Sequence, residues 1–151
     1  MKVGDVVGDF ELPDETGATR KLSDFLAKGP VVLFFYPAAM TTGCTKESCH
    51  FRDLKAEFEE AGGQRIGISA DAVAKQREFS DKHGFDYPLL SDTDRTIAER
   101  FGVKRRLTML PNKRSTFVID TDGKVLAVIN SELNMNQHAD KALEVLRRRA
   151  A

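Results

Sequence analysis

The sequence has no tryptophan, only two cysteines in 151 residues, and no excess of charge of either sign. Lysine plus arginine and aspartate plus glutamate each total 23, so no net electric field would attract nucleic acid or anionic lipid. Two cysteines are too few for a disulfide-stapled scaffold, and we expect reduced thiols, catalytic thiols or metal ligands instead. These absences argue against nucleic-acid binding and against a disulfide-rich fold.

Long hydrophobic runs are also missing. The longest run, VVLFFY at residues 31–36, is far too short to span a bilayer. The first ten residues, MKVGDVVGDF, lack the apolar core and the cleavage site of a secretory signal. We therefore expect a cytoplasmic protein without a membrane partner, and a single domain over residues 1–151, a length that can enclose one core.

The chain does contain a readable succession of strands and helices. Apolar spacing and turn residues predict a hairpin near residues 10–17, a buried strand at 31–36, a helix over about 43–61, a strand at 64–69, a helix from an Asp71 N-cap to about 83, a short helix at 97–101, a hairpin over 115–129 and a helix at 136–149. Residues 104–113 carry no clear signal. The order βαβ, then a helical segment, then ββα predicts an α/β, thioredoxin-like domain with a mixed central sheet, helices on both faces and an N-terminal β-hairpin.

The segment TTGCTKESCHF, residues 41–51, holds both cysteines. Cys44 falls in the first turn of the predicted helix, where free backbone N–H groups and the helix dipole favour an anion. Such positions increase the thiolate fraction of a cysteine. Thr41 can donate a hydroxyl hydrogen bond into the same pocket, and Pro37 can shield one side from water. These are the conditions for an activated sulfur nucleophile.

Cys49 lies five positions after Cys44. On an ideal helix this spacing turns the side chain by roughly 140° and separates the Cα atoms by about 8–9 Å. A disulfide needs Cα atoms within roughly 4.4–6.8 Å. The spacing therefore predicts either two unrelated thiols or a reaction cycle in which the helix unfolds locally.

These residues resemble a known family. The segment YPAAMTTGCTKESCHFRD is similar to the active-site segment of the peroxiredoxins, whose signature Pro-x-x-x-Thr-x-x-Cys is matched by Pro37, Thr41 and Cys44. Residues after Cys44 resemble the subfamily called PrxQ or bacterioferritin comigratory protein: Thr45, Glu47, Cys49, Phe51 and Arg52. The resemblance covers nearly the whole chain, from DFELPDETG through FDYPLLSD to RSTFVIDTDGKV. Thr42 departs from the pattern, since many relatives have proline there.

The resemblance implies a role for each matching residue. Cys44 would be the peroxidatic cysteine, which attacks the O–O bond of a peroxide and becomes a sulfenic acid. Thr41 would hydrogen-bond the thiolate and the peroxide, and Pro37 would shield the sulfenate. Arg114, in RSTFVID, matches the arginine that stabilises the thiolate and polarises the peroxide, and Glu47 matches the carboxylate that orients this arginine.

The resemblance also implies the rest of the cycle. Cys49 would be the resolving cysteine, which condenses with the sulfenic acid to an intramolecular disulfide. Thioredoxin or a similar dithiol would then restore both thiols by exchange. The substrates would be hydrogen peroxide and organic hydroperoxides, no cofactor would be needed, and the protein would be a monomer, as members of this subfamily often are.

Other interpretations of the same residues remain open. Cys44 could be an inert buried thiol, or the scaffold could serve as a binding or chaperone-like module without peroxide chemistry. A zinc site of Cys44, Cys49 and His50 lacks a fourth ligand, and neighbouring residues seldom point at one metal. We expect no metal, and we expect His83 and His138 to lie on helix surfaces.

Overall fold

A computed structural model describes residues 1–105 and 112–150. The elements in chain order are β1 (Glu11–Pro13), β2 (Thr19–Lys21), α1 (Leu22–Leu26), β3 (Val31–Phe35), α2 (Thr42–Asp53), α3 (Lys55–Glu60), β4 (Gln64–Ser69), α4 (Val73–His83), β5 (Leu89–Ser91), α5 (Thr96–Arg100), β6 (Ser115–Ile119), β7 (Val125–Asn130) and α6 (Met135–Ala150). The unassigned residues 104–113 fall largely outside the described part.

The central sheet has five strands in the order β5-β4-β3-β6-β7, and β1 and β2 form a separate antiparallel hairpin. Strand β3 runs parallel to β4 and antiparallel to β6, so the sheet is mixed, as predicted. Every residue of β3 is buried, because its uninterrupted apolar sequence can be covered on both faces. The predicted thioredoxin-like α/β fold with an N-terminal hairpin is therefore confirmed.

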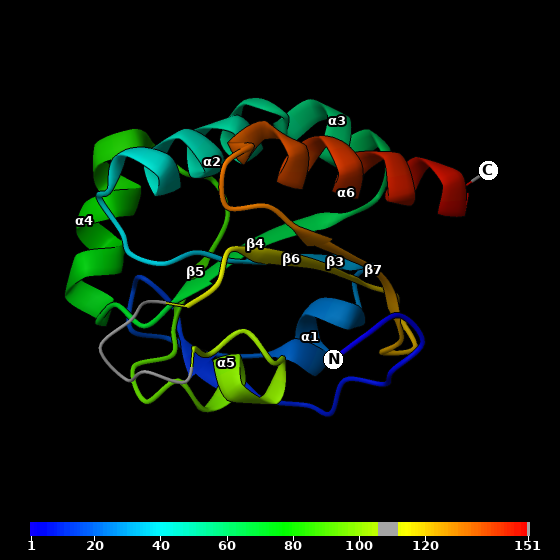
Figure 1. Cartoon of the computed structure of the whole chain (residues 1–151), viewed down its shortest axis with the longest axis horizontal. Helices are drawn as coiled ribbons and strands as arrows, with labels where there is room; N and C mark the ends of the chain where they lie inside the picture. The colour runs from blue at the N-terminus through cyan, green and yellow to red at the C-terminus, as the bar shows by residue number, and fades with distance from the viewer. Residues whose placement is uncertain (106–111, 151) are drawn as a thin grey trace.

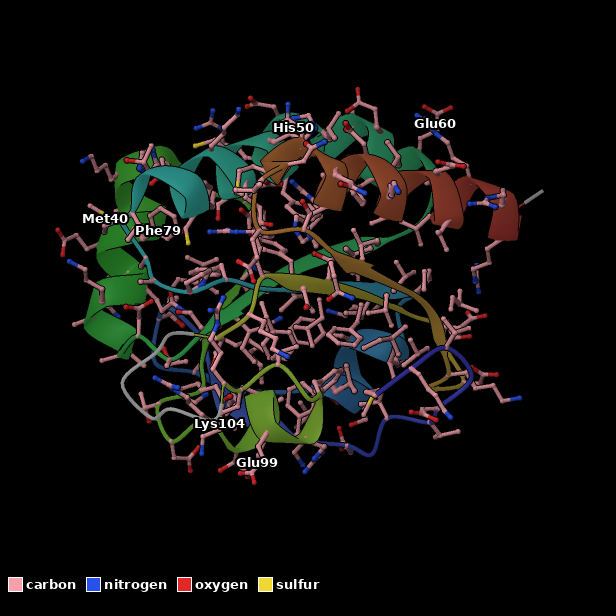
Figure 2. The ribbon with its side chains drawn as sticks, in the orientation of Figure 1. Met40, His50, Glu60, Phe79, Glu99 and Lys104 are labelled. Carbon is pink, nitrogen blue, oxygen red and sulfur yellow. The ribbon has the colours of Figure 1, made fainter. Side chains whose placement is uncertain are left out.

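Helices cover both faces of the sheet. Figure 1 shows α2, α3 and α6 over one face and α1 and α5 over the other. Side chains of β3 alternate between two hydrophobic clusters, with Leu33 facing α1 and α5 and Phe34 facing α2 and α6. In Figure 2, Phe79 of α4 points inward to the cluster that contains Phe34. Glu99 of α5 and Lys104, which follows that helix, lie at the outer edge of the molecule.

Two predicted helices have different limits in the structure. The helix predicted over 43–61 is interrupted at Leu54, whose ψ of 20° separates α2 from α3. Asp71 is not an N-cap, because Ala72 occupies that position before α4. The Asp71 carboxylate instead accepts hydrogen bonds from the Ala39 amide at 2.7 Å and the Ser69 hydroxyl at 2.6 Å. It thereby ties the loop after β3 to the end of β4.

Strand β5 was not predicted, because three residues are too few to display a period. Its pairing with β4 is parallel and extends the sheet beyond the predicted strands.

Among residues 1–105 and 112–150, none of the helices combines the length and apolar character needed to cross a membrane.

Candidate active site

The loop between β3 and α2 delivers the cysteine segment. It follows the fully buried Tyr36 and reaches Thr41, the N-cap of α2, whose ψ of 157° is extended. The Thr41 hydroxyl donates to the Ala38 carbonyl oxygen at 2.8 Å, and its side chain is exposed at the mouth of the site. Pro37 is half-buried at the start of the same loop. The structure thus places Pro37 and Thr41 on the loop that leads to Cys44.

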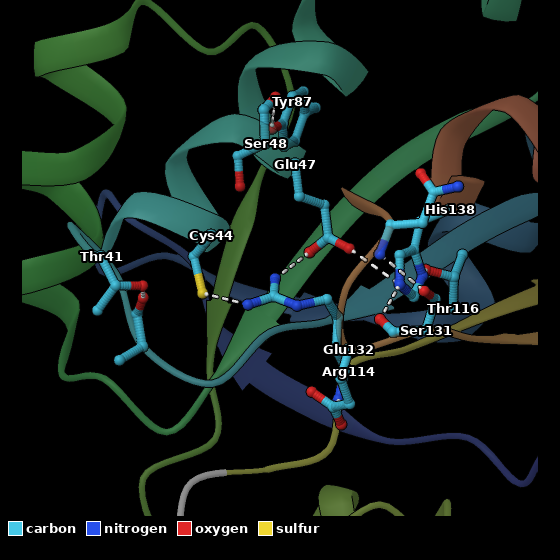
Figure 3. A network of polar contacts seen from close by, with 12 residues as sticks. Thr41, Cys44, Glu47, Ser48, Tyr87, Arg114, Thr116, Ser131, Glu132 and His138 are labelled. Carbon is cyan, nitrogen blue, oxygen red and sulfur yellow. Dashed lines mark hydrogen bonds and ion pairs between the residues drawn. The ribbon is translucent and has the colours of Figure 1, made fainter. Parts of the chain in front are cut away.

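Cys44 is the third residue of α2 and is fully buried. The Arg114 side chain, which precedes β6, reaches it from the sheet and donates from Nη2 to Sγ at 3.3 Å (Figure 3). Gly43 makes room for this approach, since a Cβ there would lie 3.2 Å from Nη2. A cationic donor and the N-terminal end of a helix therefore converge on one sulfur atom, the surroundings expected of a sulfur nucleophile.

Glu47, one turn after Cys44, binds the same guanidinium. Its Oε1 accepts a hydrogen bond from Nη1 of Arg114 at 3.0 Å, and the two side chains are 0% and 7% exposed. Burial raises the pKa of Glu47 to about 8, although the charge and the hydrogen bond of Arg114 oppose the shift. The Arg114 main-chain amide is also fixed, because it donates to Oε1 of Glu132 at 3.1 Å.

Cys49 lies on the same uninterrupted helix, and both cysteines are free thiols. Cys49 is half-buried, and burial raises the pKa of its thiol, with Arg52 opposing the shift. The two cysteines therefore have unlike surroundings. Their positions on one intact helix match the spacing argument that a bond between them requires part of α2 to unwind.

His138 was predicted to lie on a helix surface, and that prediction is wrong. The ring is fully buried under α6, with Nδ1 at 2.8 Å from the Thr116 hydroxyl and Nε2 at 2.8 Å from the Ser131 carbonyl oxygen. Its Nε2 also lies 3.4 Å from Oε2 of Glu47. A signal was present in the sequence, because Met135, His138, Ala142 and Leu146 recur at helical spacing and all are buried.

Two of the three residues of the disfavoured zinc site have other partners. Nε2 of His50 lies 2.7 Å from Oδ1 of Asp140, which joins α2 to α6, whereas Cys44 contacts Arg114. In the part of the chain that the structure describes, no group of three or more histidine, cysteine, aspartate or glutamate side chains could hold a metal ion.

Comparison with known proteins identifies the family. A model of the AhpC/TSA family matches residues 3–128. The chain belongs to the AhpC/TSA family. It is a peroxiredoxin of the PrxQ/bacterioferritin comigratory protein type, and hence a thiol-dependent peroxidase that acts on a peroxide and a thiol reductant.

Three relatives support the assignment to this type of peroxiredoxin. The peroxidoxin BcpB from Mycobacterium tuberculosis, known from a crystal structure, has 63% sequence identity to this chain. The two structures match with a TM-score of 0.95 over 98% of this chain and 97% of that one. A PrxQ mutant from Xylella fastidiosa is 28% identical, with a TM-score of 0.90 and coverage of 100% and 98%. The chloroplastic peroxiredoxin Q of Gentiana triflora is 38% identical over 143 residues, which are 95% of this chain and 65% of that protein.

Proposed function

We propose that this peroxiredoxin reduces hydrogen peroxide and organic hydroperoxides through Cys44. The Cys44 thiolate attacks the terminal oxygen, the O–O bond breaks, and the alkoxide or hydroxide that leaves takes up a proton to give an alcohol or water. The sulfur is oxidised to a sulfenic acid. The observation that carries this proposal is the 3.3 Å contact between the Arg114 guanidinium and the sulfur at the start of α2.

The neighbouring residues each support this step. The Arg114 guanidinium stabilises the thiolate and the charge that develops on the peroxide, and Glu47 holds the guanidinium in place. The Thr41 hydroxyl turns from Ala38 toward the thiolate and the bound peroxide, and Pro37 shields the sulfenate from water.

Cys49 resolves the intermediate in our proposal. Its thiol condenses with the Cys44 sulfenic acid, so an S–S bond forms and one water is released. Thioredoxin or a similar dithiol then reduces the disulfide by exchange and is itself oxidised. We infer further that the protein acts as a monomer, since both cysteines of the cycle lie within one chain. We also infer that residues 1–151 form one domain and that the protein acts in the cytoplasm.

The direct test is to treat the reduced protein with one equivalent of hydrogen peroxide and to weigh it. We expect the loss of two hydrogens. Trypsin cleaves after Lys28, Lys46 and Arg52, so non-reducing digestion should give peptide 29–46 linked to peptide 47–52. An unchanged mass with both thiols still titratable would refute the proposal and favour a module without peroxide chemistry.

Two variants divide the cycle into its steps. Cys44→Ser should consume no peroxide, because a hydroxyl cannot replace the thiolate as nucleophile. Cys49→Ser should reduce peroxide once, gain one oxygen in mass, and lose turnover with thioredoxin. Sustained turnover of Cys49→Ser at the wild-type rate would remove the resolving role from Cys49.

A further inference from the structure

His138 ends a row of buried polar side chains that begins at Cys44 (Figure 3). A carbonyl oxygen only accepts hydrogen bonds, so the 2.8 Å contact with Ser131 requires that Nε2 carries the hydrogen. Nδ1 then accepts from the Thr116 hydroxyl at 2.8 Å. The two contacts fix both the tautomer and the orientation of the ring.

The Glu47 carboxylate needs a second donor. Its Oε1 is held by Arg114, but its buried Oε2 makes no hydrogen bond of its own with the residues that the structure describes. Nε2 of His138, which donates its hydrogen to the Ser131 carbonyl oxygen, lies 3.4 Å from Oε2 and is the nitrogen nearest to supplying such a donor. A buried carboxylate oxygen without a donor is unfavourable, so this N–H is placed where the carboxylate requires one.

The His138 imidazole interacts with Glu47 through the hydrogen on Nε2 and not through a positive charge. Burial lowers the pKa of His138, the nearby Arg114 charge lowers it as well, and the hydrogen bond to Ser131 opposes the shift. A neutral ring has one donor nitrogen, and the Thr116 hydroxyl keeps that donor on the side of Glu47.

We propose that His138 is a positioning residue, whose Nε2–H holds the Glu47 carboxylate so that Arg114 stays aligned on the Cys44 sulfur. The connection runs from Thr116 in β6 through α6 to α2. The recorded partners of the imidazole are Thr116, Ser131 and Glu47, so it acts on the sulfur through Glu47 and Arg114. This inference rests on the proposed peroxidase function, because it concerns the rate at which the aligned thiolate reacts.

Two substitutions separate positioning from simple packing. In His138→Gln the amide nitrogen takes the place of Nε2 and keeps a donor near Glu47. In His138→Asn the shorter amide still accepts from the Thr116 hydroxyl but no longer reaches the carboxylate. His83→Asn, at a histidine in α4 that is outside the proposed row, is the matched control.

The readout is the second-order rate constant for hydrogen peroxide, measured from pH 6 to 9. Because the chain has no tryptophan, the reaction is followed by rapid acid quenching and mass spectrometry. The variants are compared on the alkaline plateau, where the rate constant no longer changes with pH, so the comparison reports alignment and not the amount of thiolate. We expect His138→Asn to lower the plateau about tenfold, equivalent to one hydrogen bond of about 1.4 kcal/mol, and His138→Gln and His83→Asn to stay within about twofold.

Equal plateaus for wild type, His138→Asn and His138→Gln would overturn the inference, and so would equal losses in both His138 variants. If His138→Asn fails to fold, Thr116→Val decides: releasing the ring should lower the plateau about threefold, and an unchanged plateau would contradict the inference. A wild type that consumes no peroxide would overturn the proposed function itself, an outcome distinct from an active wild type with insensitive His138 variants.

Discussion

The two halves of α2 are held in different ways. The front half, residues 42–47, carries Cys44 and Glu47, and both side chains bind the same guanidinium, that of Arg114. The rear half, residues 48–53, carries Cys49 and is held by contacts to its backbone, by apolar burial, and by the side chains of His50 and Arg52.

Backbone contacts fix the rear half independently of its redox state. The Tyr87 hydroxyl donates to the Ser48 carbonyl oxygen at 2.7 Å, a pair drawn in Figure 3, and Nη1 of Arg65 donates to the Phe51 carbonyl oxygen at 2.9 Å. The Phe51 ring is fully buried. None of these contacts depends on the charge of a cysteine.

The contacts of the front half do depend on that charge. When the Cys44 thiolate becomes a sulfenic acid, the sulfur loses the negative charge that strengthens its hydrogen bond to Arg114. This contrast indicates which part of α2 opens. We expect the front half to unwind and bring Cys44 to Cys49, while the rear half stays in place.

The largest effect should come from Arg114→Met, which removes the side chain that holds the front half. We expect the rate constant for peroxide to fall about 100-fold, because one preorganised cationic donor is lost. The free energy of unfolding should fall by about 1–3 kcal/mol at pH 7, where burial keeps Glu47 largely protonated, since its buried carboxyl loses the hydrogen bond from Nη1 of Arg114.

Its control is the double variant Arg114→Met with Glu47→Gln. The second change removes the buried carboxyl whose pKa is raised, so stability at pH 7 should largely recover whereas the rate should not. Recovery of both together would mean that Arg114 only stabilises the fold.

The pH dependence of stability should distinguish the two halves of α2, because only the front half holds a buried carboxyl group, that of Glu47. The pKa of Glu47 rises from 4.5 to about 8 on folding. Its stabilisation relative to Glu47→Gln is therefore complete below pH 4.5 and is lost as the pH rises through about 8. Urea unfolding of both reduced proteins should show the difference in free energy shrinking by at least about 1 kcal/mol between about pH 6 and pH 8. A difference that grows with pH would contradict this sign.

A smaller effect is expected from Gly43→Ala. The new Cβ would lie 3.2 Å from Nη2 of Arg114, so the guanidinium must shift away from Cys44. The rate constant should fall about fivefold, while stability should hold or rise by up to about 1 kcal/mol, because alanine favours a helix over glycine. Lys46→Ala, an exposed position of the same turn, is the control and should keep the wild-type rate.

The smallest effect on the cycle should come from Tyr87→Phe in the rear half. Loss of the hydroxyl bond to Ser48 should lower the free energy of unfolding of the reduced and oxidised proteins alike, by about 1 kcal/mol. Disulfide formation, timed by quenched mass spectrometry, should stay within about twofold. A tenfold acceleration would show that the rear half is the part that opens.

Much of this arrangement was predictable from local patterns. The apolar run of β3 predicts a central strand, and the spacing of Pro37, Thr41 and Cys44 predicts a helix-start thiol. The family pattern adds Arg114 and Glu47, which the structure places in contact. Each of these predictions depends on residues close in sequence or on a motif.

The rest depends on contacts between distant segments. Asp71 has the chemistry of an N-cap, yet its carboxylate binds the amide of Ala39, 32 positions away. His138 stands beside the predicted apolar face of α6, and only the packing of α6 on α2 reveals that its ring meets Glu47. Strand β5 is defined by its pairing with β4 rather than by its own sequence.

Hydrogen exchange of the reduced and disulfide forms would locate the part of α2 that unwinds. The amides of residues 45–51 donate to carbonyl oxygens of residues 41–47, so they should lose protection on oxidation, whereas the amides of residues 52–54 should keep it. Far-UV circular dichroism should show a matching loss of helix. Unchanged protection along all of α2, in a protein whose Cys44–Cys49 bond is proven by its mass, would contradict the account.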